Sequence, residues 1–181
     1  MKENWWFQIL GTGFAAVVLN QGAQWLIQRW RDRQASLNHG LFICTKLEAY
    51  AALCANAASD IAAYLDNPEH EIEPSFSVPK FEEMQLEAEV RHLPVAVRSR
   101  VLNFPLLVSF HQNYLAFSHR HLSGPDFWEA ALSEIALVGH TGHVLARDVA
   151  RGCGLRSWTP SLPGWDFAAV LERYKRLITP S

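Results

Sequence analysis

The stretch WWFQILGTGFAAVVLNQGAQWLI, from Trp5 to Ile27, runs for 23 residues without a charged side chain. As an α-helix it would span about 34 Å, which exceeds the hydrocarbon core of a bilayer at about 30 Å. Tryptophans, which are typical of membrane interfaces, lie at or beside both ends: Trp5, Trp6, Trp25 and Trp30. The stretch therefore predicts an N-terminal transmembrane helix.

The charges beside this stretch predict its orientation. On the N-terminal side the charges of one lysine and one glutamate cancel. On the C-terminal side there are three arginines, Arg29, Arg31 and Arg33, and one acidic residue, Asp32. Because positive charge is retained in the cytoplasm, the chain after the helix is expected there. We divide the sequence into a transmembrane anchor with a basic inner flank, residues 1–33, and a cytoplasmic helical bundle, residues 34–181.

The apolar stretch has two other interpretations. A secretory signal peptide is disfavoured because no A-x-A-like cleavage site follows the stretch and arginines do. A buried amphipathic helix of a soluble domain stays open, because five polar side chains interrupt the stretch: Gln8, Thr12, Asn20, Gln21 and Gln24.

Small side chains form one stripe on the predicted anchor. Gly11, Ala15, Val18 and Gly22 are spaced by four, three and four residues, which places them within about 60° on a helix. Small residues in one stripe let helices approach closely in lipid. We therefore expect the anchor to pair with itself, with another membrane protein, or with both.

Composition excludes several classes of protein. The 181 residues are 49% hydrophobic and 19% charged with a net charge of −2, unlike a disordered chain, a collagen or a strongly basic nucleic-acid binder. The three cysteines, Cys44, Cys54 and Cys153, include no C-x-x-C pair, and the first two lie too far apart on one predicted helix for a disulfide. These features agree with a reduced compartment and with no specific nucleic-acid partner.

The remainder predicts an all-α fold, a small bundle of four to five helices. The first helix covers residues 34–66, with Asn38 and Gly40 as a candidate joint to the anchor and Asn67-Pro68 as its end. Its core positions recur every three or four residues: Leu41, Cys44, Leu47, Ala51, Cys54, Ala58, Ile61 and Leu65.

Later helices follow from prolines, glycines and periodicity. We expect a loop over 67–80, short helices over 81–102 broken near Pro94, and a helix from Phe104-Pro105 to about Leu122. A capping box over 123–126 is expected to start a helix over 126–151, and Gly152 and Gly154 are expected to end it. A last helix covers residues 166–178. The helix over 126–151 has one apolar stripe, in which Gly142 predicts a close helix crossing: Ala131, Ile135, Val138, Gly142, Leu145 and Val149.

A donor-rich face is predicted on the same helix. His140, His143, Arg147 and Arg151 are spaced by three, four and four residues, away from or beside the apolar stripe. Such a face suits an anionic ligand, lipid headgroups or the acidic stretch 60–89 of a neighbour, although a merely solvated face is the simpler interpretation.

Eight histidines invite a metal hypothesis, but H-E-x-x-H and Glu-x-x-His are absent, so no metal site is assigned. His111 and His121 are instead expected to be hydrogen-bonded and half-buried. No nucleophile, base and oxyanion donors assemble in any motif. We therefore assign no catalytic residue and no cofactor, and expect a protein that is not an enzyme.

The run from Trp25 to Tyr64, with Leu47-Glu48-Ala49-Tyr50-Ala51 and Cys54 after an arginine-rich stop, resembles uncharacterised bacterial proteins with one N-terminal membrane helix. This resemblance covers about a quarter of the chain and implies a bacterial inner-membrane protein without implying an activity.

Three functional hypotheses remain at this point. The first is an oligomerising anchored protein that acts through protein–protein association at the cytoplasmic face. The second is a membrane-perturbing effector, for example in phage defence, gated by an anionic ligand or partner. The third is a histidine-based metalloprotein.

Overall fold

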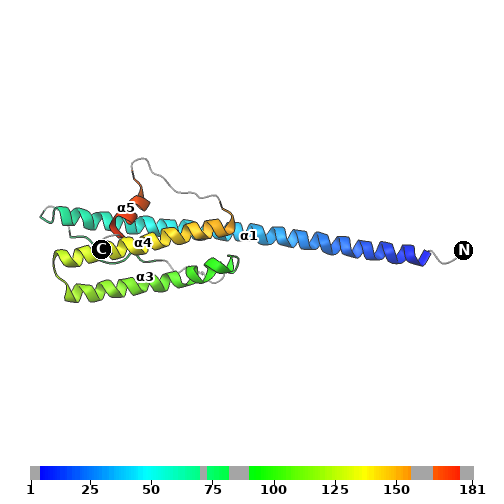
Figure 1. Cartoon of the computed structure of the whole chain (residues 1–181), viewed down its shortest axis with the longest axis horizontal. Coiled ribbons are helices and arrows are strands. Elements are labelled where there is room, and N and C mark those ends of the chain that lie inside the picture. Colours follow the sequence, from blue (N-terminus) through cyan, green and yellow to red (C-terminus); the bar gives the residue numbers. More distant parts are fainter. Residues whose placement is uncertain (1–4, 70–72, 82–89, 156–164, 176–181) are drawn as a thin grey trace.

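The computed structural model describes residues 5–69, 73–81, 90–155 and 165–175, and side chains of the first helix from Asn20 onward. The regular elements of these residues are helices, so the expected all-α class is confirmed (Figure 1). The helices are α1 (Trp5–Asp66), α3 (Val95–His121), α4 (Pro125–Cys153) and α5 (Phe167–Lys175).

Helix α1 is continuous over 62 residues, about 93 Å. The candidate joint at Asn38 and Gly40 was wrong, because the helix passes through both residues without a break. Gly40 serves packing instead: a Cβ atom there would lie 2.6 Å from the Sγ of Cys153 on α4. The glycine therefore lets the end of α4 approach α1 closely.

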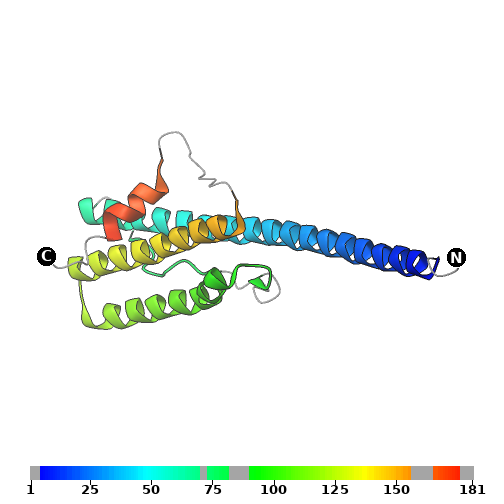
Figure 2. The same ribbon diagram turned by 45° about the vertical axis from the view of Figure 1, so that its right-hand side comes forward.

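The other helices pack around the C-terminal half of α1, whereas its N-terminal half projects beyond them (Figures 1 and 2). Helix α4 packs against α1, α3 and α5, and α5 also packs against α1. In both views α4 lies between α1 and α3. Helix α4 is thus the centre of the bundle, and α3 is its outer helix on the side opposite α1.

The predicted apolar stripe of α4 is confirmed, since all six of its residues are buried. The predicted close crossing at Gly142 is also present: a Cβ atom there would lie 3.1 Å from Cζ of Phe104 and 3.7 Å from the carbonyl oxygen of Leu47. Gly139, which the sequence did not single out, is closer still, at 2.5 Å from Cβ of Cys54. These two glycines leave room on α4 for the side chains of Cys54 and Tyr50 on α1 and of Phe104 on α3.

The predicted core positions on α1 are buried over most of their length. Five are buried and two are partly buried, but Leu41 is 53% exposed. The buried positions between Leu47 and Ile61 include three alanines, whose small side chains suit the close approach of α4.

Helix α3 begins earlier than the sequence predicted. It starts at Val95, directly after Pro94, so Pro105 lies inside the helix rather than in its first turn. Proline removes one backbone hydrogen bond from a helix interior. Buried residues on both sides of Pro105, such as Val101 and Val108, pack the helix along the bundle and compensate for that loss.

The ends of α4 differ in how well they were predicted. The expected capping box is wrong, because the N-cap is Gly124 at φ +61° and no side chain caps the helix, which begins with Pro125. Gly154, at φ +71°, ends the helix as expected, while Gly152 stays within it.

At the start of α5 the carboxylate of Asp166 accepts hydrogen bonds from the N–H groups of Ala168 and Ala169. The predicted extension to residue 178 lies partly outside the described residues.

Candidate functional site

Residues 20–34 of α1, here called the stem, are exposed at every position. Trp25 and Trp30 are 57% and 63% exposed, and Leu26 and Ile27 are similarly uncovered. From Asn20 onward, α1 is the one helix of the described residues that is long and apolar enough to cross a membrane, but the stretch that meets this test is 44% buried and therefore lies in the bundle half rather than in the stem. The stem therefore presents four large apolar side chains that the described part of the chain leaves exposed.

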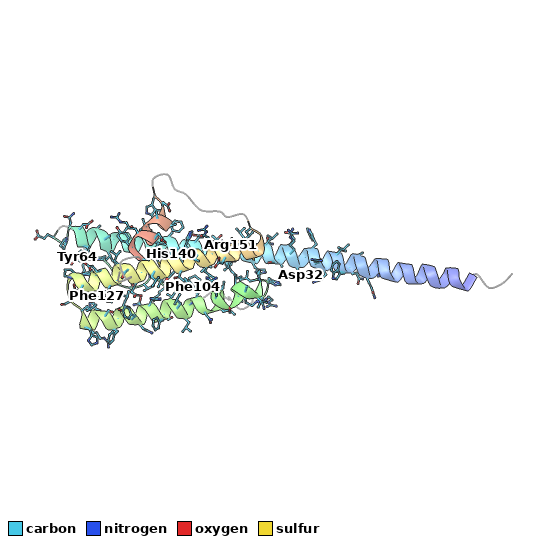
Figure 3. The ribbon with its side chains drawn as sticks, viewed as in Figure 1. Asp32, Tyr64, Phe104, Phe127, His140 and Arg151 are labelled. Atoms are coloured by element: carbon cyan, nitrogen blue, oxygen red, sulfur yellow. The ribbon has the colours of Figure 1, made fainter. Side chains whose placement is uncertain are left out.

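Cations follow the aromatic residues along the stem. The guanidinium of Arg29 lies 5.0 Å from the ring centroid of Trp25, a cation–π contact. Nε2 of Gln28 donates to Oδ1 of Asp32 at 3.1 Å, and the Arg31 and Arg33 side chains are exposed. Figure 3 shows Asp32 on the part of α1 that projects from the bundle.

The predicted small-residue stripe lies N-terminal to most of the stem. Gly11, Ala15 and Val18 fall outside the residues whose side chains are described. At Gly22 an added Cβ atom would meet nothing within 4 Å, so no other part of the described chain packs there. The stripe stays a prediction about contacts with another molecule.

The predicted donor face on α4 is divided, because His143 points into the bundle. Its Nδ1 lies 2.8 Å from Oε2 of Glu48 on α1, and the two residues are only 5% and 6% exposed. The ring of Phe167 on α5 packs edge-on against the imidazole at a centroid distance of 5.4 Å. The sequence missed this arrangement because the partner glutamate is 95 residues away and α5 covers a face of α4 that periodicity left open.

His140 contacts two side chains of α5. Its Nε2 lies 2.8 Å from Nζ of Lys175, which also contacts Oε2 of Glu172 at 2.6 Å. An ammonium group only donates, so Nε2 accepts and the ring proton resides on Nδ1, which faces Glu172 at 3.5 Å. Burial, then the nearby Lys175, lowers the pKa of His140 below its ordinary value. A neutral histidine held in this way is a poor ligand for an anion.

The two arginines form the outward part of the predicted face. Arg147 is exposed, and Nη1 of Arg151 lies 3.0 Å from Oδ1 of Asp148. The other oxygen of Asp148 contacts Nη1 of Arg100 on α3 at 2.6 Å. His140 and Arg151 are both labelled in Figure 3, well apart along α4. Of the four residues of the predicted face, the two arginines towards the end of α4 are thus the exposed cations.

The remaining histidines differ from one another. His111 is half-buried and pairs with Glu134, as expected, whereas His121 is exposed and tilted against Phe117, so the expectation of burial was wrong there. Among the described residues no three His, Cys, Asp or Glu side chains are grouped so that they could hold a metal ion. The metalloprotein hypothesis therefore receives no support from this part of the chain.

The cysteine thiols are free. The Cys44 thiol donates to the carbonyl oxygen of Ala146 at 3.2 Å, and Cys54 is fully buried. Burial raises the pKa of each of these two thiols to about 12, so both stay protonated at neutral pH. They are structural side chains rather than nucleophiles.

An apolar stripe on α3, here called the α3 stripe, was not predicted. It consists of large side chains at successive helical turns that are exposed to solvent: Leu102, Leu106, Phe110, Tyr114 and Phe117. Its four-residue spacing is visible in the sequence, but the predicted start of the helix near residue 104 obscured the face that these residues share. It is the longest apolar face of the described bundle that no other element covers.

Comparison of the chain with protein-family models, with curated proteins and with solved structures finds no match.

Proposed function

We propose that this protein is anchored by the N-terminal part of α1 in the bacterial inner membrane and acts through protein–protein association at the cytoplasmic face. The observation that carries the proposal is the continuity of α1. One helix provides both the exposed stem, with its four large apolar side chains, and one wall of the bundle. A membrane that holds the stem would therefore fix the position of the bundle without a flexible linker.

The exposure of the stem supports the anchor. Leaving a large apolar side chain in water costs about 1.5–3 kcal/mol relative to burying it, and four such side chains are exposed between residues 25 and 30. A bilayer would cover them, with tryptophans at the interface and the following arginines at the headgroups. A core helix of a soluble domain would instead be covered by its own chain.

The polar groups of the bundle support association rather than catalysis. His143, His140 and His111 each face a glutamate from another helix, and Cys44 and Cys54 are held protonated. These contacts join helices to one another. The surfaces left for partners are the stem, the α3 stripe and the arginines at the end of α4.

Membrane fractionation tests the proposal. We expect the full chain to resist extraction by carbonate and to show a multimeric mass by light scattering after solubilisation in detergent. The double variant Phe14→Arg plus Val17→Arg should move to the soluble or aggregated fraction, because each arginine costs about 2.5–3.5 kcal/mol at the centre of a membrane helix.

Leu41→Arg is the matched control, since it adds a cation to the same helix at an exposed site beyond the stem. This variant should remain in the membrane. A wild-type protein that is released by carbonate as a soluble monomer would overturn the proposal. Protection of a C-terminal tag from protease added to spheroplasts is expected for the cytoplasmic orientation.

A further inference from the structure

The α3 stripe is a continuous apolar surface. Leu106, Phe110 and Phe117 are 71%, 66% and 58% exposed, and Leu102 and Tyr114 are exposed to a smaller extent. Spacings of four and three residues keep the five side chains on one side of the helix. The residues of α3 that are buried, such as Val101 and Val108, form the other side.

The position of α3 leaves this surface open. In Figures 1 and 2, α3 lies at the edge of the bundle on the far side of α4, and its Phe104 reaches past α4 to contact Tyr50 of α1 edge-on at a centroid distance of 5.5 Å. It packs on α4 through its buried side, so the α3 stripe faces away from the bundle. A contact made through the α3 stripe would therefore be separate from a contact made through the anchor.

The size of the surface suits a protein interface. The two phenylalanines and the tyrosine alone expose on the order of several hundred Å², since an aromatic side chain can bury about 150–250 Å². The largest apolar patch on a typical monomer is of about this size and is often functional. A specific interface buries about 800 Å² per partner, which the α3 stripe and its polar neighbours can supply.

The charges around the α3 stripe suit pairing with an identical surface. The exposed neighbours Ser99, Asn103 and Asn113 are uncharged. Two ionisable side chains of α3 are directed into the bundle, since Arg100 pairs with Asp148 and His111 pairs with Glu134, whereas the exposed Arg120 lies at the C-terminal end of the helix. Two copies can therefore bring their α3 stripes together without opposing like charges at the centre of the contact.

The direction of α3 favours a second copy over lipid. Helix α3 runs alongside the bundle half of α1 in both views. If α1 crosses the membrane, α3 stands away from the bilayer and lipid cannot cover the α3 stripe along its length. Copies held in one membrane present their α3 stripes in parallel, at the same height and at high local concentration.

We propose that the α3 stripe packs against the α3 stripe of a second copy of this chain, around a two-fold axis along the membrane normal. This inference rests on the proposed function, because the shared membrane aligns the two helices. Two-fold contacts between identical surfaces are the commonest in oligomers. The anchor contact, where present, is a second interface of the same assembly.

Cross-linking of the full chain in membrane vesicles tests the contact. Asn113→Cys places a thiol beside Phe110 and Phe117, and a short bis-maleimide should link two copies into a dimer. Asn56→Cys is the matched control, since Asn56 is exposed on α1 away from the α3 stripe and should give no dimer. Wild-type protein measures the background of Cys44, Cys54 and Cys153.

A disrupting variant identifies the surface responsible. Leu106→Glu plus Phe110→Glu, combined with Asn113→Cys, should lower the dimer yield at least tenfold with little change in thermal unfolding, because both side chains are exposed. Leu53→Glu, at an exposed site on α1, should leave the yield unchanged. Gly11→Leu plus Gly22→Leu, in the anchor, should also preserve the α3 cross-link.

The outcomes separate this inference from the proposed function. Carbonate-released protein counts against the anchor, whatever the cross-linking shows. Membrane-bound protein without the Asn113→Cys dimer, or with a dimer that the glutamates leave unchanged, overturns the α3 contact. Protection of the Asn113→Cys thiol from a membrane-impermeant maleimide without a dimer overturns it as well, in favour of lipid.

Discussion

The two halves of α1 are parts of one helix in opposite surroundings. The stem carries tryptophan, leucine and isoleucine side chains and is exposed throughout. The bundle half carries Ile43, Leu47 and Ile61 among alanines on its core face and is buried there. Large apolar side chains of α1 are therefore buried only where other helices pack against them.

The difference between the halves teaches what makes a close helix contact. Gly139 of α4 lies against the Cys54 side chain of α1, and Gly142 lies against the side chains of Phe104 on α3 and Tyr50 on α1. Small residues on both helices shorten the distance between them, and the buried area then comes from the backbones and the neighbouring side chains. Among the described residues nothing lies within 4 Å of a Cβ atom added at Gly22, so the stem has no such partner there.

The largest expected difference between the halves is the change in the free energy of unfolding when a carboxylate is removed. Glu48→Ala leaves His143 buried without its carboxylate, and removing one member of a buried pair costs about 3–5 kcal/mol. Asp32→Ala, the matched change in the stem, should alter the free energy of unfolding by less than about 0.5 kcal/mol. Denaturant unfolding in mild detergent, followed by circular dichroism, measures both changes. Equal effects of the two substitutions would contradict the contrast between the halves.

A smaller difference in stability is expected when a glycine in each half is replaced by alanine. Gly139→Ala forces a Cβ atom to 2.5 Å from Cβ of Cys54, and overpacking of this kind costs about 1–3 kcal/mol. Gly22→Ala meets open space and should raise the helix stability by up to about 1 kcal/mol, because alanine restricts the unfolded backbone. The two variants should therefore shift the thermal midpoint in opposite directions. A Gly139→Ala protein as stable as the wild type would show that α1 and α4 can move apart at little cost.

The smallest expected effect is a pH dependence confined to the bundle. The folded state lowers the pKa of His140 from 6.5, so below pH 6.5 the unfolded chain binds this proton more readily and stability falls as the pH falls. His140→Gln should therefore lose less stability than the wild type between pH 7.5 and pH 5.5. His121→Gln, at an exposed histidine, should follow the wild-type profile. Identical profiles for the His140→Gln variant and the wild type would exclude His140 as a source of acid sensitivity.

Sequence patterns predicted the features that depend on neighbours along the chain. The stripe from Ala131 to Val149 is buried as its periodicity indicated, and Gly154 ends α4 because its φ of +71° favours glycine. The start of α3 was misplaced because Pro105 resembles a helix start locally, whereas packing against α4 keeps it in a helix interior. The capping box failed for a related reason, since Gly124 at positive φ sets the chain direction before Pro125.

The candidate site was less predictable than the fold. The four residues of the predicted donor face share one side of an isolated helix, but α5 and Glu48 occupy His140 and His143. Those partners lie between 32 and 95 residues away, so no local spacing could reveal them. The exposed arginines at the end of α4 were predictable because nothing packs over them.

By itself the sequence determined that the chain is helical, where its charges stop the apolar stretch, and which face of α4 is apolar, because these properties depend on residues three or four positions apart. Only the tertiary structure decided that α1 is one uninterrupted helix, that His143 is paired inside the bundle, and that the α3 stripe is left uncovered. Each of these depends on which helices pack together, because burial and pairing are properties of the space between elements rather than of any one element.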